Sequence, residues 1–309
     1  MPRTTPNKWN KITVSIIGAG RLGTALALAL ASRGYSIEAL VARRLSHSQK
    51  AVKALGGVGL ALSEGQLAQL PQSQILLITT PDDVIRSMAE RLASSQKAMR
   101  PGRTVLHTSG ALSSEELRSL FALGFHTGSL HPLVSVSDPA SGAKNFNGAF
   151  FCLEGDPVAV RISRRLVRDL GGHGFSIERR SKALYHAAAV MASGHMTALF
   201  DIAIEMLGRC GLSESRARKV LLPLVESAVR NLATMTPARA LTGTFARGDT
   251  ATVRRHLAAL EDPLLAEALA AYVLLGRRSL SLSKRNKRTV TTSAQISKLL
   301  RLSEKRNRK

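Results

Sequence analysis

A glycine-rich turn near the N-terminus constrains the fold of this chain more than any other feature. The turn reads Gly18-Ala19-Gly20-Arg21-Leu22-Gly23; it follows the β-branched run 12–17 and precedes an Ala/Leu-rich segment that continues to residue 32. Between a strand and a helix, such glycines allow a tight turn and let the backbone approach a pyrophosphate, which the N–H groups at the helix start bind. We therefore expect these six residues to bind a dinucleotide. The alternative is a purely structural glycine turn.

Strands and helices alternate along the first part of the chain. Apolar runs that predict strands recur at 36–41, 74–79, 104–107, 128–130, 149–153 and 174–177. Helical segments are expected between several of them, at 48–55, 84–93 and 156–170. Strands that alternate with helices form parallel sheets. The sequence thus predicts an α/β fold, a doubly wound and mostly parallel Rossmann sheet, over residues 1–179.

The pattern changes after residue 179. Ala/Leu-rich segments with a helical period occupy 183–210, 214–235, 251–260 and 264–282. We expect an all-helical C-terminal domain over 180–282 that contributes to substrate binding and to dimerisation. The last segment, 283–309, is rich in Lys, Arg, Ser and Thr and is predicted to be a basic, mostly disordered tail.

The net charge is unusually high for a chain of this length. The 309 residues include 44 basic and 21 acidic side chains, which give +23. The tail alone holds ten basic residues and one acid, or +9. Within the tail, Ile296, Leu299, Leu300 and Leu302 are spaced for a short amphipathic helix. No nucleic-acid motif accompanies this charge, so a nucleic-acid partner is not expected, although the basic tail leaves docking on nucleic acid or an anionic membrane open.

Composition excludes several other classes of protein. Cys152 and Cys210 are the only cysteines and have no second Cys or His at metal-ligand spacing, which argues against a disulfide scaffold and predicts no metal site. No window is uninterrupted and apolar enough for a transmembrane segment, and the first ten residues lack the features of a signal peptide. With 44% hydrophobic residues, the chain is predicted to be a soluble, cytoplasmic protein.

The end of the second predicted strand indicates which dinucleotide binds. An NAD site requires an acidic side chain there for the ribose 2′-hydroxyl, whereas this chain has Arg43 and Arg44. Guanidinium groups offer a planar, permanently charged fork to phosphate oxygens. We therefore predict NADP(H) as the cofactor. The alternative is a solvated basic loop.

Two further loops are expected to line the cofactor and substrate crevice. Ligands of doubly wound sheets bind at the carboxyl ends of the strands. The loop residues in question are Thr79, Thr80, Pro81 and Asp82 after one buried strand, and Thr108 and Ser109 after the next. Ordinary turn chemistry is the alternative explanation for both loops.

His131 is the first candidate for proton transfer. It follows the predicted strand 128–130, again at a carboxyl end, and is followed by a proline. An imidazole titrates near neutral pH and can exchange the proton that accompanies hydride transfer. The alternative is a packed histidine that the proline holds in place.

A polar stripe on the first helix of the second domain supplies further candidates. Lys182, His186 and Ser193 stand at i, i+4 and i+11, which places them within about 40° of one another on a regular helix. Arg247 lies in a predicted small-residue loop, 242–249, between two helices and is suited to a substrate carboxylate. We predict that these residues contact the substrate; hydrogen-bonded polar groups at a helix-packing surface are the alternative.

With these residues in view, the chain resembles a bacterial family of unknown function that pairs a Rossmann-like NADP-binding domain with an all-helical C-terminal domain. The resemblance is carried by IIGAGRLGTALA, TTPDDVI, HTSGAL, GSLHPL, YHAAAVMASGH and LTGTFARGDTATVRRHLAAL. The wider superfamily includes prephenate dehydrogenase, pyrroline-5-carboxylate reductase, ketopantoate reductase and the β-hydroxyacid dehydrogenases. This resemblance implies a dinucleotide-dependent oxidoreductase and a homodimer formed through the helical domains.

The resemblance also implies roles for single residues. GSLHPL is similar to the Gly-x-His-Pro segment of prephenate dehydrogenases, which makes His131 the acid/base, and HTSGAL is similar to their serine-bearing loop, which places Ser109 beside the reacting oxygen. Lys182-x-x-x-His186 is similar to the Lys-x-x-x-Asn helix of β-hydroxyacid dehydrogenases, in which lysine donates the proton. The chain departs from both patterns: Tyr185-His186 replaces the His-Asp pair of the prephenate enzymes, and His186 also replaces the asparagine of the Lys-x-x-x-Asn helix.

Together these observations predict an NADP(H)-dependent oxidoreductase for a small keto, hydroxy or imino acid, with His131, Lys182 and Ser109 as the catalytic residues. Whether His131 or Lys182 donates the proton is left open. The competing hypothesis is a non-catalytic NADP(H)-binding sensor or scaffold that docks through its basic tail.

Overall fold

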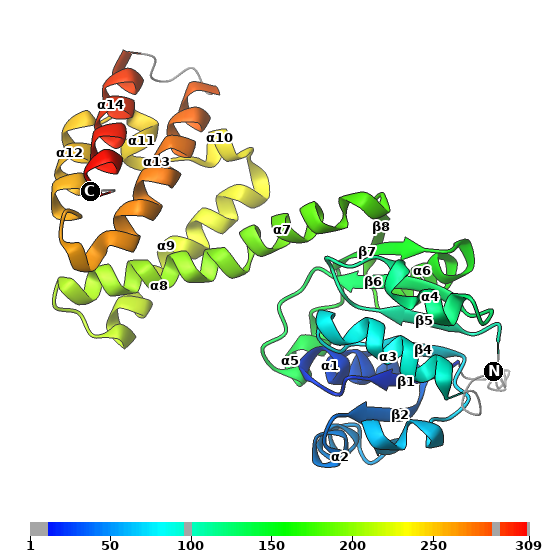
Figure 1. Cartoon of the computed structure of the whole chain (residues 1–309). Helices are drawn as coiled ribbons and strands as arrows, with labels where there is room; N and C mark the ends of the chain where they lie inside the picture. The colour runs from blue at the N-terminus through cyan, green and yellow to red at the C-terminus, as the bar shows by residue number, and fades with distance from the viewer. Residues whose placement is uncertain (1–11, 96–100, 286–290, 308–309) are drawn as a thin grey trace, which may run out of the picture. The chain divides into compact units, whose positions relative to one another are not determined.

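The computed structural model describes residues 12–95, 101–285 and 291–307. The chain forms two compact units, Met1–Ala192 and Ser193–Lys309, which are described separately (Figure 1). Residues 1–11, on which the expected lack of a signal peptide depends, lie outside the described residues, as do positions 286–290 and 308–309 of the basic tail.

The first unit contains an eight-stranded sheet. Its strands are β1 (Thr13–Ile17), β2 (Ser36–Ala42), β3 (Leu60–Ser63), β4 (Ile75–Ile78), β5 (Thr104–His107), β6 (His126–Pro132), β7 (Phe150–Gly155) and β8 (His173–Ser176). They are arranged in the order β3-β2-β1-β4-β5-β6-β7-β8, and only the β6–β7 pair is antiparallel. The predicted doubly wound, mostly parallel sheet is confirmed. Strand β3 was not predicted because it is short and lies at the sheet edge, where it is only partly buried.

Helices cover both faces of this sheet. They are α1 (Arg21–Ser32), α2 (Leu45–Ala54), α3 (Asp82–Ser94), α4 (Arg118–Phe121), α5 (Pro139–Lys144) and α6 (Pro157–Asp169). One apolar core includes Leu30, Phe146 and Phe151, and a second includes Ile85 and Leu120. Two separate cores are expected when a sheet whose strands are apolar on both faces lies between two helical layers.

Helix α7 (Lys182–Ala192) belongs to the first unit, although the sequence predicted a domain boundary at residue 180. The helical segment predicted over 183–210 is interrupted at Ser193, which leaves the helical conformation, with φ −122° and ψ −73°. Helix α8 (Gly194–Arg209) starts directly afterwards. A Ser-Gly pair is a common site of helix breaks, since neither residue favours the helix interior. Ser193 therefore does not continue the polar stripe of Lys182 and His186.

The helical stretch Arg179–Arg209 is the only one among the described residues that is long and apolar enough to cross a membrane. Length and composition are the only grounds for this, and core helices of soluble proteins pass the same test. A single such stretch is weak evidence for a membrane span.

The second unit is entirely helical in its described part. It comprises α8, α9 (Glu214–Thr234), α10 (Pro237–Ala240), α11 (Gly243–Arg247), α12 (Thr250–Ala259), α13 (Ala266–Arg285) and α14 (Thr291–Asn307). The core of this unit joins Val253 of α12, Leu269 and Val273 of α13, and Ile296 and Leu300 of α14.

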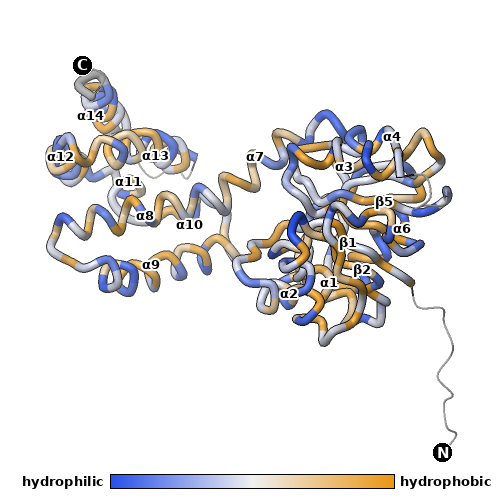
Figure 2. Tube along the Cα trace, turned by 60° about the horizontal axis from the view of Figure 1, so that its bottom comes forward, coloured by the Kyte–Doolittle hydropathy of each residue, from blue (hydrophilic) through white to orange (hydrophobic). Residues whose placement is uncertain are grey.

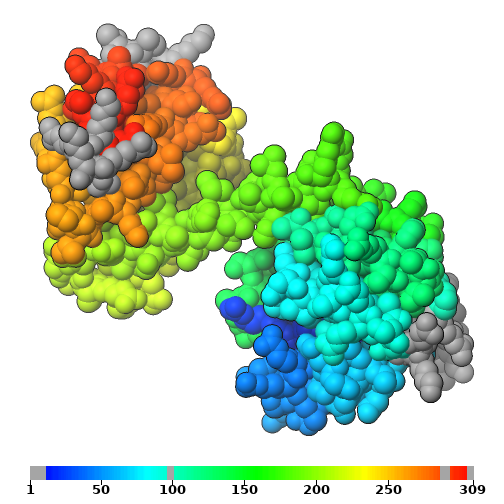
Figure 3. Space-filling model, in the orientation of Figure 1, coloured from blue at the N-terminus to red at the C-terminus, as the bar shows by residue number. Residues whose placement is uncertain are grey.

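Helix α14 overturns the prediction of a mostly disordered tail for residues 291–307. It lies beside α13, as the red and orange segments of Figure 3 show. Ile296 and Leu300 are fully buried, while Leu302 remains exposed. The predicted amphipathic helix is confirmed, with Ile296 and Leu300 on its buried face, but Leu302 does not belong to that face. Helices α12 and α13 cover the apolar stripe.

Candidate active site

The glycine turn is built as its motif requires. Gly18 has φ +108°, which only glycine adopts readily, and a Cβ there would lie 2.7 Å from the Thr79 carbonyl carbon. A Cβ at Gly23 would collide with the Gly18 carbonyl oxygen, whereas one at Gly20 would meet nothing within 4 Å. Helix α1 begins after Gly20 without a side-chain cap. Two glycines therefore allow close packing of the turn, while the third leaves open space beside a helix N-terminus.

A cavity of about 330 Å³ opens at this turn. It is lined by Gly18, Ala19, Gly20, Ala42, Arg43, Arg44, His47, Glu64, Thr79, Thr80, Pro81 and Val84. The cavity brings together the turn, the end of β2 and the end of β4, as expected for the carboxyl edge of a doubly wound sheet. Arg21 instead lines a neighbouring cavity with His47 and Lys50, and Leu22 packs against the core of the first unit.

The loop after β4 is hydrogen-bonded to the glycine turn. The Thr79 hydroxyl donates to the Gly18 carbonyl oxygen over 2.6 Å, which ties the glycine turn to β4. Thr80 faces the same cavity, and its buried hydroxyl has no hydrogen-bond partner among the residues that the structure describes. Such an orphaned group is uncommon in protein interiors and fits a site that a ligand completes. Asp82 begins α3 and accepts a 2.8 Å hydrogen bond from the Ser109 hydroxyl.

Lys182 is the most deeply buried charged side chain of the site, with 1% of its surface exposed. Its Nζ donates to the Ser109 carbonyl oxygen over 2.9 Å and to the Ser129 hydroxyl over 2.8 Å. Burial lowers the pKa of Lys182, while Cys152, Glu154 and Asp82 act in the opposite direction. The first residue of α7 thus places an ammonium group at the carboxyl ends of β5 and β6.

The Ser109 hydroxyl forms its hydrogen bonds with Asp82 and with the backbone of its own loop. Besides donating to Asp82, the hydroxyl accepts hydrogen bonds from the Ala111 and Leu112 N–H groups, at 3.2 and 2.9 Å. It is therefore engaged in turn structure, and the Ser109 carbonyl is the atom that reaches Lys182. Thr108 is buried, and its N–H bonds to the Ile78 carbonyl oxygen.

His131 lies next to Tyr185 and His186. Its Nδ1 is 2.7 Å from the Tyr185 hydroxyl, and its ring meets that of His186 edge-on, with centroids 5.5 Å apart. Burial, helped by His186, Lys182 and His107, lowers the pKa of His131 to about 4. Where the Tyr185 hydroxyl donates to Nδ1, the neutral imidazole carries its own proton on Nε2.

Gly110 leaves room for both histidines. A Cβ at this position would lie 2.8 Å from His131 Nε2 and would also press on the His186 ring. The absence of a side chain at Gly110 lets the loop after β5 approach the two rings closely. This contact brings the loop of Ser109, the end of β6 and the middle of α7 into one cluster.

His107 is a further buried histidine that the sequence did not single out. Its Nε2 is 3.0 Å from the Ser113 carbonyl, which only accepts, and its Nδ1 accepts from the Ser109 N–H. This assigns the proton to Nε2. Burial is the main reason that the pKa of His107 is lowered to about 4. His107 therefore acts as a neutral brace for the Ser109 loop.

The predicted substrate residues are divided between the two units. His186 joins the cluster around His131, whereas Ser193 and Arg247 belong to the second unit. Arg247 ends the short helix α11 and is followed by Gly248 at φ +69°, so it does not lie in a loop as predicted. The contacts of Ser193 and Arg247 with a substrate remain predictions.

Sequence reasoning missed several members of this cluster. They are Ser114, Ser129, Cys152, Glu154 and Arg179, whereas His107 and Tyr185 stood in the predicted motifs without a role of their own. Strand pairing reveals three of them, since Ser129 stands opposite Glu154, and His131 opposite Cys152, across β6 and β7. An antiparallel pairing between residues more than twenty positions apart has no local signature in the sequence.

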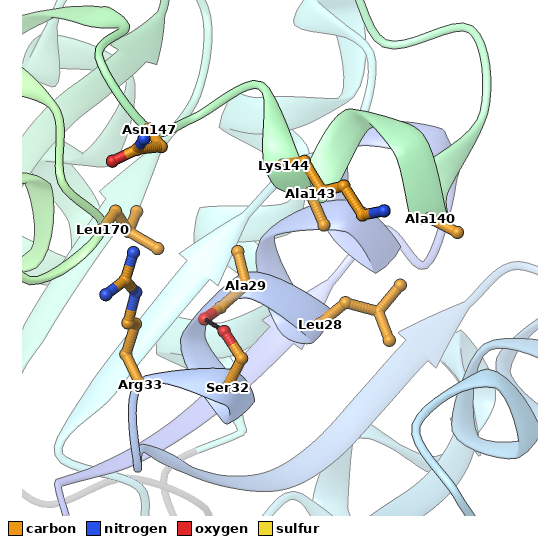
Figure 4. Close-up of a pocket in the computed structure, with 9 residues that line it drawn as sticks. All are labelled: Leu28, Ala29, Ser32, Arg33, Ala140, Ala143, Lys144, Asn147 and Leu170. Carbon is orange, nitrogen blue, oxygen red and sulfur yellow. Dashed lines mark hydrogen bonds between the residues drawn. The ribbon is translucent and has the colours of Figure 1, made fainter.

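A further cavity of the first unit lies apart from this cluster. A cavity between α1 and α5 is lined by Leu28, Ala29, Ser32, Arg33, Ala140, Ala143, Lys144, Asn147 and Leu170 (Figure 4). It includes none of the predicted site residues. Over residues 12–95, 101–285 and 291–307, no cluster of three or more His, Cys, Asp or Glu side chains could hold a metal ion.

Comparison with protein families identifies both parts of the chain. Residues 2–132 match a Rossmann-like domain, and residues 149–279 match a domain of unknown function, DUF2520. The chain pairs a Rossmann-like domain with a DUF2520 domain. The DUF2520 match starts beside β7, so the family domain includes Glu154 and Lys182 from the first unit as well as most of the second. No functionally curated protein matches the sequence significantly.

Solved structures share the fold of this Rossmann–DUF2520 chain. Protein TM1727 from Thermotoga maritima is 22% identical, with a TM-score of 0.67 over 89% of this chain and 100% of its own. BF3122 from Bacteroides fragilis, described as a candidate NADP oxidoreductase, is 22% identical, with a TM-score of 0.70 over 88% and 98%. Pyrroline-5-carboxylate reductase from Streptococcus pyogenes is 14% identical, with a TM-score of 0.57 over 96% and 100%. At these identities the likeness establishes the fold.

Proposed function

We propose that this protein is an NADP(H)-dependent oxidoreductase that transfers a hydride between nicotinamide and a small keto, hydroxy or imino acid. The observation that carries the proposal is the buried Lys182 ammonium beside neutral His131, at the same edge of the sheet as the glycine turn. A buried charge is costly unless it has a function or a partner. The names of two structural neighbours, an NADP oxidoreductase candidate and a reductase of a C=N bond, support the same class of reaction.

The residues at the glycine turn fit a dinucleotide. Open space at Gly20, the uncapped start of α1 and the orphaned Thr80 hydroxyl together form a cradle for a pyrophosphate. Arg43 and Arg44 line the same cavity and are suited to a 2′-phosphate. When bound, NADPH supplies the hydride.

We assign proton donation to Lys182. The ammonium is the charged acid of the cluster, whereas the low pKa of His131 leaves its imidazole neutral above about pH 5. Neutral His131 still offers its Nε2–H as a hydrogen-bond donor to a substrate oxygen or nitrogen. The Ser109 carbonyl holds Lys182 in place. His186, which lies in the same cluster, is proposed to orient the acid group of the substrate.

We also propose that the protein is a homodimer formed through α8 and α9. Large apolar side chains on these helices are exposed, namely Met196, Leu199, Val220, Leu222, Leu224, Val229 and Leu232. Figure 2 shows orange, apolar positions recurring along both helices. A face of this kind on a soluble chain marks an interface. In light scattering, the wild type should have twice the chain mass, and Leu224→Glu with Leu232→Glu should shift it to one chain mass.

Enzyme activity is tested by NADPH oxidation with a panel of 2-keto acids and cyclic imino acids. Turnover that Lys182→Met abolishes and Lys144→Met preserves would support the proposal, since Lys144 is exposed on α5. NADPH binding without any turnover would favour the sensor hypothesis instead.

The cofactor preference is tested separately. The Arg43→Ala/Arg44→Ala variant should bind NADPH about tenfold to a hundredfold more weakly than the wild type and should bind NADH with unchanged affinity. Equal losses for NADPH and NADH would contradict the assignment of the arginines.

A further inference from the structure

A row of buried polar side chains crosses three strands beneath Lys182. His107 on β5 is paired with Ser129 on β6, and Ser129 is paired with Glu154 on β7. Residues directly opposite one another on neighbouring strands project to the same face of a sheet. The three side chains therefore lie side by side, and all are buried.

Glu154 is held in this row by donors that favour a carboxylate. The Ser114 N–H and hydroxyl each donate to it over 2.7 Å, and Arg179 Nε approaches to 3.2 Å. The Ser129 hydroxyl, which accepts from Lys182, is 3.5 Å from Glu154 Oε2. With Lys182 as its donor, the Ser129 hydroxyl has its single proton free to point at Glu154.

We propose that Glu154 is the internal counter-ion of Lys182, coupled to it through the Ser129 hydroxyl, and that it keeps the buried ammonium charged between catalytic cycles. The catalytic role of this counter-ion rests on the proposed function. The electrostatic coupling between Glu154 and Lys182 does not, because it exists in the protein without substrate or cofactor. Glu154 and Ser129 are positioning residues, because they act on Lys182 and not on a substrate.

The other charged groups around Lys182 do not replace Glu154. Asp82 is separated from it by the Ser109 loop, to whose hydroxyl it is bonded. Burial raises the pKa of the Cys152 thiol, so this group is uncharged at neutral pH. His107 and His131 are neutral, and Arg179 is a cation that offsets part of the Glu154 charge. Glu154 is thus the carboxylate that a single hydroxyl links to the ammonium.

Titration of Lys182 in the ligand-free protein tests the proposal directly. The lysine side chains are labelled with ¹³C and ¹⁵N, the Lys182 signal is assigned by its loss in Lys182→Arg, and its chemical shift is followed against pH. Glu154→Gln should lower the Lys182 midpoint by about one pH unit or more, because it removes a nearby opposite charge. Ser129→Ala should lower it by less. An unchanged midpoint in Glu154→Gln would overturn the proposal.

Two further variants separate coupling from general damage. Arg179→Gln removes the cation that competes for Glu154, so it should raise the Lys182 midpoint. If Glu154→Gln fails to fold, Ser129→Ala carries the test, because it removes the hydroxyl link and leaves the Glu154 charge; an unchanged midpoint in that variant would overturn the proposal. Glu115→Gln is the matched control, because Glu115 pairs with Arg179 at the exposed surface, and it should have little effect. A fall of the midpoint in Arg179→Gln would contradict the proposal.

The titration does not depend on turnover. If the midpoint moves as expected but no substrate is reduced, the counter-ion stands and the proposed function fails. If substrates are reduced but the midpoint does not respond to Glu154→Gln, the function stands and the counter-ion is wrong.

Discussion

The two units of this protein place their polar and apolar groups in opposite ways. The first unit encloses a polar network inside its fold, where Lys182, Ser129 and Glu154 are all buried. The second unit exposes large apolar side chains along α8 and α9, and its buried core is supplied mainly by α12, α13 and α14, with Ile202 and Met206 of α8 packed against it. Buried polar groups are retained where chemistry needs them, whereas exposed apolar faces are retained where another surface covers them. The contrast matches the two proposals made above, chemistry in the first unit and dimerisation through the second.

The largest expected effect tests whether chemistry belongs to the first unit. Lys182→Met should reduce the rate of NADPH-dependent turnover by roughly 10²- to 10⁴-fold, the usual contribution of a general acid. Single-turnover kinetics with a saturating substrate measure this rate, with Arg247→Met as a comparison from the second unit. A larger loss in Arg247→Met than in Lys182→Met would move the chemistry to the second unit and break the contrast.

Acid should destabilise the first unit through its buried histidines. The unfolded chain takes up a proton on His107 and His131 near pH 6.5, but the folded unit does so only near a pKa of about 4. The contribution of these two histidines to the free energy of unfolding is therefore fully present above pH 6.5. It decreases as the pH falls toward 4, by about 2 kcal/mol for each histidine between pH 7 and pH 5. Urea unfolding at the two pH values measures this difference. His131→Asn should remove about half of it, and an unchanged pH dependence would show that the buried polar network does not control acid stability.

The second unit depends on its apolar core instead. Leu300→Ala should lower the free energy of unfolding of this unit by about 3 kcal/mol, since the side chain is fully buried between helices. Leu302→Ala is the matched control on the same helix, because its side chain is 49% exposed, and should cost well under 1 kcal/mol. Hydrogen exchange followed by peptide mass spectrometry localises the loss. Equal effects of the two substitutions would mean that α14 does not complete the core.

The smallest expected effect concerns the main chain at the cofactor cavity. Gly20→Ala should weaken NADPH binding about tenfold while leaving the thermal midpoint unchanged, because the added methyl group meets only the open space reserved for a ligand. Gly208→Ala in α8, where a Cβ also meets nothing, is the control and should leave NADPH binding intact. Isothermal titration calorimetry measures both affinities. Unaltered binding in Gly20→Ala would place the pyrophosphate elsewhere.

Local patterns predicted the elements of the fold well. The glycine turn, the alternation of strands and helices and the all-helical second part are short-range signals, because backbone conformation and amphipathic burial repeat every two to four residues. The same locality explains the errors. Ser193 interrupts a helix that composition alone would continue. The high charge of the tail predicted disorder, whereas Ile296 and Leu300 of the tail are buried against α12 and α13.

The sequence by itself determined that this chain has a dinucleotide-type turn, two parts of different class and a set of polar residues at strand ends. Only the tertiary structure decided which of these residues meet. In the folded chain, Lys182 donates hydrogen bonds to the Ser109 carbonyl and the Ser129 hydroxyl. The Ser109 hydroxyl bonds within its own loop, and Ser129 is paired with Glu154 across β6 and β7. The physical reason is that strand register and helix docking depend on contacts between distant segments, which no single stretch of sequence encodes.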